Sequence, residues 1–344
     1  MTEPLRPIEW TGSALRVIDQ TALPGRLVHL DLDSVDAVVD AIVRLAVRGA
    51  PQLGAVGAIG VVIAMDQAAR EGWDDARLQA EVDRVRNARP TAVNLVWGVD
   101  RVRPRMADGR DAVLEAALAI IADDERCNRA MAKQGADWIQ ARVPGKVRVL
   151  THCNTGALAT TAWGTAFGVI RELHERGALE VVYADETRPL LQGARLTAYE
   201  LAHDGIPHFV QADGAAASTI LRGLVDVAII GADRIAANGD TANKIGSVGV
   251  AIACKEAGIP FLVAAPESTV DVSTTDGDAI HIEMRGDDEV LNWGGVRTAP
   301  EGSRAHNPAF DVTPARYIAA LFTENGVLEI SKGDTPGSRL VAAR

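Results

Sequence analysis

The second part of the chain alternates short apolar runs with segments of helical periodicity, and this rhythm limits the possible folds more than any other feature. Five such runs cover residues 147–151, 179–185, 207–213, 225–233 and 260–266. Apolar residues recur at three- and four-residue spacing between them, which predicts helices over 155–177, 189–205 and 247–258 and a further one after residue 213. Strands that alternate with helices in this way indicate βαβ units and a mostly parallel, doubly wound sheet.

Helical periodicity predominates in the first part of the chain. Helices are expected over 36–47, 54–70, 76–88 and 111–143, and a small hairpin over 15–32. We therefore expect an α/β protein in which a mainly helical N-terminal domain with a small β hairpin precedes a Rossmann-like domain with a mostly parallel, doubly wound sheet. The expected boundaries are 1–143 for the helical domain, 147–335 for the Rossmann-like catalytic domain and 336–344 for a tail.

Composition and charge exclude several classes of protein. The 344 residues include 46 Asp and Glu against 35 Lys and Arg, a net charge of −11. Such an acidic chain is unsuited to phosphate backbones, so we expect no nucleic-acid partner. The three cysteines cannot form a paired framework, and with no secretory-signal pattern at the start they indicate a cytoplasmic protein. The longest apolar run, 54–65, is too short to span a bilayer and predicts a buried helix, not a membrane span.

Ligands of open α/β sheets bind beyond the carboxyl ends of the strands, so the polar residues after each apolar run are the first candidates for a site. These residues are Thr151-His152-Cys153-Asn154, Asp185-Glu186-Thr187-Arg188, Asp213, Asp233-Arg234 and Pro266-Glu267. Because parallel strands end at the same edge of a sheet, we expect the five polar clusters to converge.

Cys153 and Asp233 have the residue types and places that catalysis needs. Cys153 lies before a predicted helix N-terminus, which would lower the pKa of its thiol; a small buried residue at a tight turn is the alternative. Asp233 ends a buried strand, where desolvation raises the pKa of a carboxyl and suits it to general acid catalysis; a loop-capping Asp is the alternative. Cys127 and Cys254 lie inside helical patterns, and we expect both to be core residues.

Three segments could bind an anion. Residues 236–247 form a Gly- and Asn-rich stretch with one lysine, Lys244, which could cradle a phosphate although it matches no P-loop. Arg48 and Arg89 each lie beside Gly or Pro in a predicted loop, and are either solvated surface residues or an anion clamp. The chain contains no His-x-x-His or Cys-x-x-Cys pair and no Gly-x-Gly-x-x-Gly after a strand, so we expect neither a metal nor another cofactor.

Several longer segments together resemble the methylthioribose-1-phosphate isomerase family, whose relatives include archaeal ribose-1,5-bisphosphate isomerases and regulatory subunits of translation-initiation factor 2B. The matching segments are VRGAPQLGAVGA, ARPTAVNLVWG, THCNTGALAT, YADETRPLLQGARLTAYEL, GADRIAANGDTANKIGS, VAAPEST and GGVRTAPEG with NPAFDVTP. They follow in family order from residue 47 to about 315 and so cover most of the chain. The stretches GADRIAANGDTANKIG and THCNTG are the most specific.

The resemblance implies a helical domain on a Rossmann-like domain, a homodimer, and Cys153 and Asp233 as the catalytic pair. It also implies substrate-binding residues, namely Arg48, Gly49, Ala50, Arg89, Gln192, Asn243 and Lys244. Gln52-Leu53 departs from the family pattern, which more often has small or β-branched residues after RGAP.

The activity that the resemblance implies is an aldose–ketose isomerisation of 5-methylthioribose 1-phosphate to 5-methylthioribulose 1-phosphate, a step of methionine salvage. Either proton transfer through Cys153 or a hydride shift from C2 to C1 could complete it, with Asp233 as the acid. Two alternatives stay open: an isomerase of 5-deoxyribose 1-phosphate or ribose 1,5-bisphosphate, and a non-catalytic subunit of the initiation-factor type. The small and apolar residues of the matched segments favour the methylthio sugar.

Overall fold

The structure is a computed structural model that describes residues 5–90 and 92–342. The start of the chain, on which the secretory-signal expectation partly rests, lies outside the described residues at 1–4, as do residues 343–344 of the expected tail. The chain divides into two compact units, of which unit 1 comprises residues 1–127 with 155–164, and unit 2 comprises 128–154 with 165–344.

Unit 1 combines a small sheet with helices. Its antiparallel sheet has the order β1 (Ile8–Trp10), β2 (Leu15–Ile18), β3 (His29–Leu32), so the expected hairpin is part of a three-stranded sheet. The helices are α1 (Val35–Val43), α2 (Ala50–Glu71), α3 (Asp75–Arg86), α4 (Val93–Val102) and the first part of α5 (Arg110–Gln140). The sequence patterns predicted all of these helices except α4.

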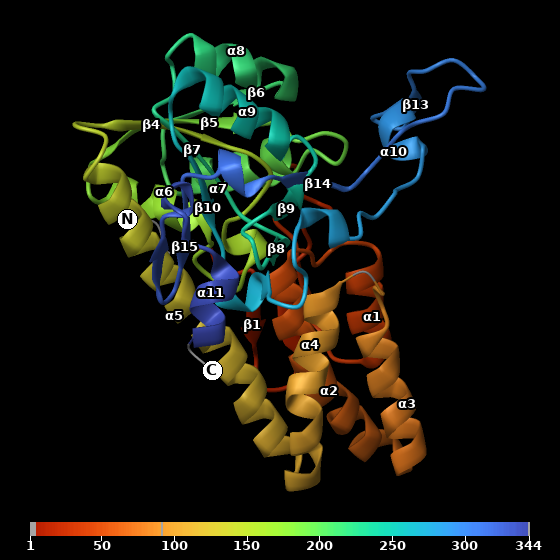
Figure 1. The fold of residues 1–344 in the computed structure, drawn as a ribbon. Helices are drawn as coiled ribbons and strands as arrows, with labels where there is room; N and C mark the ends of the chain where they lie inside the picture. The colour runs from red at the N-terminus through yellow and green to blue at the C-terminus, as the bar shows by residue number, and fades with distance from the viewer. Residues whose placement is uncertain (1–4, 91, 343–344) are drawn as a thin grey trace. The chain divides into compact units, whose positions relative to one another are not determined.

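Helix α2 is the centre of the unit 1 core. Glycines allow α4 to pack closely against it: a Cβ on Gly98 would collide with the backbone of Gly54. Figure 1 shows the two helices side by side. By length and composition α2 could cross a membrane, but 78% of its apolar window is buried inside the protein, as in the core helix of a globular domain. The expected buried helix is confirmed, although it is longer than the run 54–65 indicated.

Unit 2 is built around a seven-stranded sheet of order β16-β15-β10-β7-β4-β5-β6. The strands are β4 (Val147–Thr151), β5 (Leu179–Asp185), β6 (His208–Gln211), β7 (Val227–Ile230), β10 (Phe261–Ala264), β15 (Ala320–Thr323) and β16 (Gly326–Leu328). Only β16 pairs antiparallel within this sheet. The predicted α/β class with its mostly parallel sheet is therefore confirmed, and the sequence patterns missed only β15 and β16.

The helices of unit 2 are shorter than expected. They are α6 (Ala166–Glu175), a π-helical turn (Gly193–Thr197) that continues into α7 (Ala198–His203), α8 (Ala216–Leu221) and α9 (Ser247–Ala257). The helix predicted over 155–177 is wrong in its first half. Gly164 adopts a left-handed conformation there, packed so closely on Thr155 and Gly156 that a Cβ would collide with their backbone, and the chain turns before α6 begins.

A second, four-stranded sheet in unit 2 has the order β11 (Val270–Asp271), β8 (Arg234–Ala236), β9 (Thr241–Lys244), β14 (Phe310–Thr313). The stretch predicted as a Gly- and Asn-rich loop is therefore mostly the β8–β9 hairpin, a correction to the sequence analysis. Figure 1 shows α10 (Asp288–Leu291), β12 (Asn292–Trp293) and β13 (Val296–Arg297) on an arm that extends away from the rest of unit 2.

The expected domain boundaries differ from the observed units at two places. The last part of α5 belongs to unit 2, because Gly135 packs on Val169 and the Trp138 ring lies 5.9 Å from that of Phe322. Residues 155–164 belong to unit 1. The expected tail is also partly ordered structure, since Pro336–Ala342 form α11.

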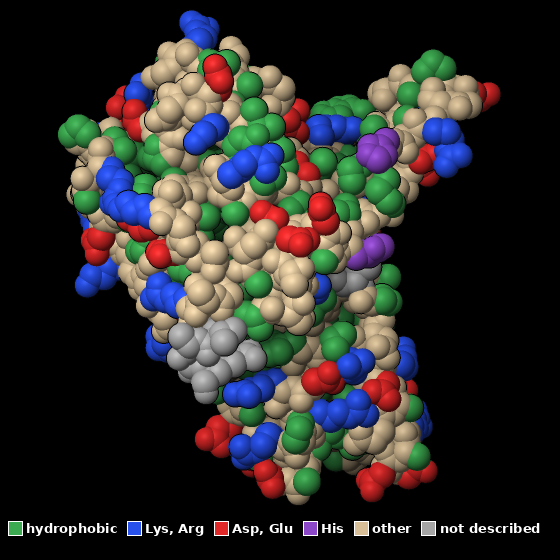
Figure 2. Space-filling model, in the orientation of Figure 1, with side chains coloured by type: hydrophobic (Ala, Val, Ile, Leu, Met, Phe, Trp, Pro, Cys, Tyr) green, Lys and Arg blue, Asp and Glu red, His purple; other side chains and the backbone are tan. Residues whose placement is uncertain are grey.

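Short 3-10 turns connect the elements at Arg103–Asp108, Ala157–Ala159, Asp213–Ala215, Glu267–Thr269, Gly277–Ala279, Ala315–Tyr317 and Ile330–Lys332. Figure 2 shows Lys and Arg side chains interspersed with Asp and Glu over the visible face of each unit. Such mixing is the ordinary surface of an acidic globular protein.

Candidate active site

The carboxyl ends of β4 and β5 meet through a buried histidine and aspartate. His152 follows β4, Asp185 ends β5, and both side chains are 1% exposed. Nδ1 of His152 lies 3.0 Å from Oδ2 of Asp185, and Nε2 lies 2.8 Å from the carbonyl oxygen of Ile245, which follows β9. The imidazole therefore bridges the segments that follow three strands.

Cys153 sits next to this bridge in a constrained backbone. Its φ is +67°, its N–H donates to Thr187 Oγ1 at 2.9 Å, and its carbonyl accepts from Thr197 Oγ1 at 2.6 Å. The residue is half-buried. The prediction that a helix begins directly after Cys153 is wrong, because α6 starts only at Ala166.

Asp233 lies three residues beyond the end of β7 and is exposed, so the predicted burial of its carboxylate is wrong. The strand is shorter than the apolar run suggested, and the chain bends away from the sheet before Asp233. Its N–H donates to the carbonyl of Ala242 at 2.9 Å. This hydrogen bond places Asp233 beside the start of the segment that carries Asn243.

Asn243 and Lys244 lie on β9, paired with Asp311 and Phe310 of β14. Both are largely buried, at 4% and 9% exposure. Asn243 Nδ2 donates to Ser247 Oγ at 2.9 Å, while Lys244 Nζ donates to the carbonyl of Ala309 at 2.7 Å and lies 4.4 Å from the ring centre of Phe310. The ammonium of Lys244 is thus buried between a backbone carbonyl and an aromatic face, surroundings that suit a cation.

Gln192 stands at the start of the π-helical turn and is 2% exposed. Its Oε1 is buried and accepts no hydrogen bond from the described part of the chain. Buried polar atoms without partners are uncommon in native structures, and π-helical turns occur often at functional sites. The amide oxygen of Gln192 is therefore suited to accept a hydrogen bond from a ligand hydroxyl.

The other predicted substrate-binding residues belong to unit 1. Arg48, Gly49 and Ala50 lead into α2, with Gly49 as its N-cap at φ +91°. A Cβ on Gly49 would collide with the backbone of Ala159, so only glycine fits. The N-terminus of a long helix, with an arginine beside it, favours anions. Arg89 is half-buried in the turn after α3.

Gln52 marks the departure from the family pattern. It is fully buried, and its amide contacts that of Gln20 at 2.8 Å. The residue is therefore held inside unit 1 by polar contacts and fits its surroundings.

Sequence reasoning assigned no role to His152, Asp185 or Thr187, although all three belong to the polar clusters that follow the strands. Asp213 completes the group: its two carboxylate oxygens accept from the N–H groups of Thr187 and Arg188, each at 2.7 Å. Ligand atoms of His152, Asp185 and Asp213 lie within 4.8 Å of one another, a spacing that could hold a metal ion. Each of them already makes a hydrogen bond within the protein, which favours a hydrogen-bond network as their role.

The pKa values of the buried pair are shifted. Burial by itself lowers the pKa of His152, but its hydrogen bond to Asp185 and the charges of Asp185 and Asp213 outweigh that effect and raise it. Burial also raises the pKa of Asp185, against the hydrogen bonds from His152 and Gln211. We assign the shared proton to the ring, because Asp213 and Asp311 also act on His152 and favour its positive form.

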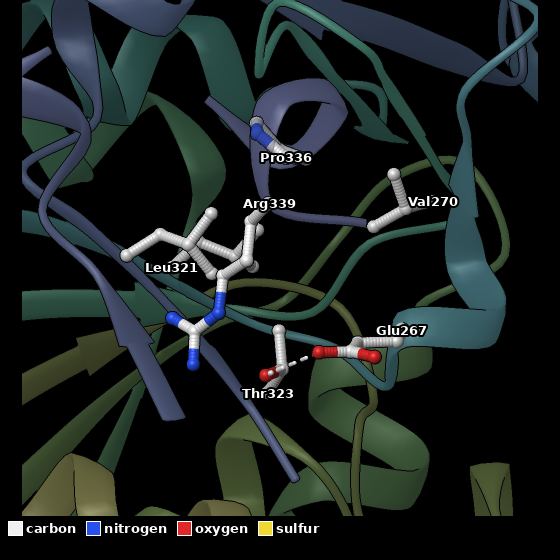
Figure 3. Close-up of a pocket in the computed structure, with 7 residues that line it drawn as sticks. Glu267, Val270, Leu321, Thr323, Pro336 and Arg339 are labelled. Atoms are coloured by element: carbon white, nitrogen blue, oxygen red, sulfur yellow. Dashed lines mark hydrogen bonds between the residues drawn. The ribbon is translucent and has the colours of Figure 1, made fainter. Parts of the chain in front are cut away.

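A separate hollow in unit 2 lies near the carboxyl ends of β10 and β15, as Figure 3 shows. Its lining residues are Glu267, Val270, Leu321, Thr323, Leu328, Pro336 and Arg339. The polar groups in it bind one another or nearby backbone: Asn325 Nδ2 donates to Glu267 at 2.9 Å, and Arg339 donates to the carbonyls of Val327 and Asn325. The hollow is closely packed, and of the candidate residues named from the sequence Glu267 lines it, whereas the predicted catalytic and substrate-binding residues do not.

Comparison with known proteins decides the family. The model of the Initiation factor 2 subunit family matches residues 46–330, most of the chain. The chain belongs to the Initiation factor 2 subunit family. Among solved structures, 5-methylthioribose 1-phosphate isomerase from Pyrococcus horikoshii superimposes with a TM-score of 0.89 at 36% identity, over 99% of this chain and 96% of that one.

Curated relatives are more similar in sequence than this solved structure. A methylthioribose-1-phosphate isomerase from Alkalilimnicola ehrlichii is 50% identical over 94% of both chains. A probable bifunctional methylthioribose-1-phosphate isomerase/methylthioribulose-1-phosphate dehydratase from Nocardia farcinica is 52% identical over 98% of this chain, which spans 62% of that relative's length. These matches confirm the resemblance stated from the sequence.

Proposed function

We propose that the chain is an aldose–ketose isomerase that converts 5-methylthioribose 1-phosphate into 5-methylthioribulose 1-phosphate in methionine salvage. The observation that carries the proposal is its identity of 50% with a named isomerase of this kind, over 94% of both chains. The joined segments of unit 2 support it, because they bring catalytic residue types together at the carboxyl edge of the sheet, where α/β enzymes bind ligands.

In the proposed mechanism Asp233 is the general acid and Cys153 the general base. Asp233 donates a proton to the ring oxygen as the bond between C1 and that oxygen breaks. The Cys153 thiolate then removes the C2 proton, leaving an enol that still carries the phosphate on C1 and the hydroxyl on C2. The Cys153 thiol, whose proton has exchanged with solvent, then protonates C1. The C2 hydroxyl gives its proton back to Asp233, so the ketone forms and both side chains regain their starting states. Because Asp233 is exposed in the structure, its desolvation would come from bound substrate.

The proposed substrate-binding residues divide by chemistry. The cations Arg48, Arg89 and Lys244, and the backbone of Gly49 and Ala50 at the start of α2, have the chemistry that binds a phosphate. Gln192 and Asn243 bind sugar hydroxyls. Gln192 is suited to this because its buried Oε1 lacks a donor in the described part of the chain.

The decisive experiment measures turnover of 5-methylthioribose 1-phosphate by variants of the proposed pair. Cys153→Ser and Asp233→Asn should each lower kcat by about 10²–10⁴-fold, the usual effect of a positioned acid or base. Cys127→Ser is the matched control and should keep near-normal turnover, since Cys127 lies on α5 in unit 1. Near-normal turnover by either site variant would remove that residue from the mechanism.

The route of hydrogen transfer has its own test. Proton transfer through Cys153 predicts that deuterium from heavy water enters the product at C1. A hydride shift from C2 to C1 keeps the original hydrogen, and no deuterium would appear there. NMR of the product separates the two routes.

Substrate choice and partners complete the proposal. Turnover should be higher with the methylthio sugar than with 5-deoxyribose 1-phosphate or ribose 1,5-bisphosphate, whose second phosphate would need further cations. A chain that turned over none of the three and co-purified with a stoichiometric protein partner would instead be a regulatory subunit.

We propose a cytoplasmic homodimer that needs no cofactor, and light scattering would measure its mass.

A further inference from the structure

The proposed mechanism uses Cys153 but gives no role to the buried residue before it. His152 is 1% exposed, as is Asp185, and burying an ionisable pair is costly unless every polar atom is satisfied. Both ring nitrogens have close acceptors, at 3.0 Å on Asp185 and 2.8 Å on Ile245. A buried ionisable pair whose hydrogen bonds are all made is suited to hold the neighbouring backbone segments in position.

The segments joined by this pair are those that carry the proposed site. His152 directly precedes Cys153, and Ile245 directly follows Lys244. Asp185 is linked to the segment that carries Gln192. Its backbone carbonyl accepts a hydrogen bond from Thr187 Oγ1 at 3.0 Å, and the same carbonyl lies so close to Gly193 that any Cβ on Gly193 would collide with it. Gly193 in turn directly follows Gln192.

The ring is also clamped by packing. Gly246 has φ +110°, and a Cβ on it would come within 2.7 Å of His152 Cε1, so the imidazole lies directly against this turn. Asp311 fixes the turn from its other side by accepting from the N–H of Gly246 at 2.7 Å. A shift of the ring would therefore move the turn between β9 and α9.

We propose that the His152–Asp185 pair is the positioning element of the active site, which sets Cys153, Gln192 and Lys244 relative to one another. This inference rests on the proposed isomerase function and deepens it. The pair acts through these residues and does not itself touch the substrate. Misplacing catalytic groups by about 1 Å can cost about 10²-fold in rate, so the pair matters to turnover well beyond its share of folding stability.

Two isosteric variants separate the two hydrogen bonds of the ring. His152→Asn keeps a donor near the Nδ1 position and so preserves the bond to Asp185, while it loses the bond to Ile245. His152→Gln keeps a donor near the Nε2 position and does the reverse. Positioning requires both bonds, so each variant should lose about 10–100-fold in kcat, with a much smaller change in KM. A role in folding alone would leave kcat of the folded fraction unchanged.

The matched control is His208→Gln on β6, since His208 is half-buried and its Nδ1 contacts only the carbonyl of Ile206, at 2.8 Å, among the described residues. It should keep wild-type kcat. Circular dichroism and the midpoint of urea unfolding establish the folded fraction of each variant. Turnover within about twofold of wild type for both His152 variants would overturn the proposal.

A second measurement distinguishes this inference from the proposed function. The alkylation rates of Cys153 and Cys127 by iodoacetamide, resolved by peptide mass spectrometry, require no substrate. Positioning predicts that both His152 variants change the rate at Cys153 and leave that at Cys127 unaltered. A wild-type chain that is inactive on all three sugars refutes the proposed function, whereas unchanged Cys153 reactivity in both variants refutes the positioning role.

Discussion

The backbone N–H of Cys153 donates a 2.9 Å hydrogen bond to the side-chain oxygen of Thr187. The two residues follow neighbouring parallel strands, β4 and β5, and both have φ near +65°, at +67° and +65°. Non-glycine residues rarely adopt this conformation, and for a β-branched residue such as Thr it is a marked exception. The Thr187 hydroxyl donates its proton to the carbonyl of Asp185, so its oxygen lone pair is available to accept the hydrogen bond from the Cys153 N–H. The hydroxyl of Thr187 thus holds the N–H of this strained residue, while the hydroxyl of Thr197 holds its carbonyl.

Replacing this hydroxyl should weaken both the fold and the site. Thr187→Val keeps the shape of the side chain but leaves the Cys153 N–H and the Asp185 carbonyl without their partner, which costs about 1–3 kcal/mol for a buried group. Thr187→Ser keeps the hydroxyl and is the control. We expect urea unfolding to show the loss only for Val, together with a fall in kcat. Equal stability and turnover in Val and Ser would show that the bond does not hold Cys153.

Gly193 should tolerate no side chain. A Cβ there would collide with the carbonyl oxygen of Asp185, which is backbone and cannot move aside. Gly193→Ala should therefore lower the midpoint of urea unfolding and abolish turnover, because the π-helical turn after Gln192 cannot close on β5. Gly214→Ala is the matched control, since its Cβ meets nothing within 4 Å. A Gly193→Ala variant as active as the control would mean that the turn can move without loss.

Sequence patterns predicted the main sheet well because its inner strands are buried on both faces. The sequences of such strands are nearly continuous apolar runs, as in β7 and β10. The β8–β9 hairpin was not predicted, because Thr241, Asn243 and Lys244 are polar and yet buried. Each of these side chains makes a hydrogen bond that no local sequence pattern reveals. The false helix after Cys153 has a similar origin, since small apolar residues suit either a helix or a close-packed turn.

The candidate site shows the same limit. Residue type and position after a strand were enough to single out Cys153 and Asp233, and the family resemblance supplied Gln192 and Asn243. The His152–Asp185 bond could not be predicted, because it joins residues 33 positions apart whose side chains meet only when β4 and β5 pair in the observed register. Local sequence patterns predict burial and periodicity, whereas a contact between distant residues depends on how the strands are ordered and paired in the sheet.

Asp240 should make stability depend on acid pH. Burial by itself would raise the pKa of this carboxyl, but the hydrogen bonds from Ala315, Asn238 and Gly277 outweigh it and lower the pKa below its ordinary value of 3.8. A lowered pKa in the folded state means that the ionised carboxyl stabilises the fold above the ordinary value. The contribution is then lost as pH falls through the lowered value.

Asp240→Asn tests this sign. At neutral pH the variant should lose about 1–3 kcal/mol in the free energy of urea unfolding, because an amide nitrogen then faces backbone donors. The difference from wild type should shrink as pH falls below 3.8, where the wild-type carboxyl also takes up a proton. Asp278→Asn, at an exposed position of the nearby 3-10 turn, should show little difference at any pH. A difference for Asp240→Asn that grows in acid would contradict the assigned shift.

The three thiols should differ in reactivity, and Cys254 should be the least reactive. It is fully buried on α9, and burial with the nearby charge of Asp185 raises its pKa to about 12. At pH 8 only about one molecule in ten thousand then carries the thiolate, the form that reacts with iodoacetamide. Cys153 and Cys127 are half-buried, so Cys127 is not the core residue that its helical pattern suggested. We expect peptide mass spectrometry to find Cys254 unmodified in the native protein and modified once urea unfolds it. Modification of Cys254 as fast as that of Cys127 in the native state would show that α9 opens readily, and would contradict the tight clamp at Gly246.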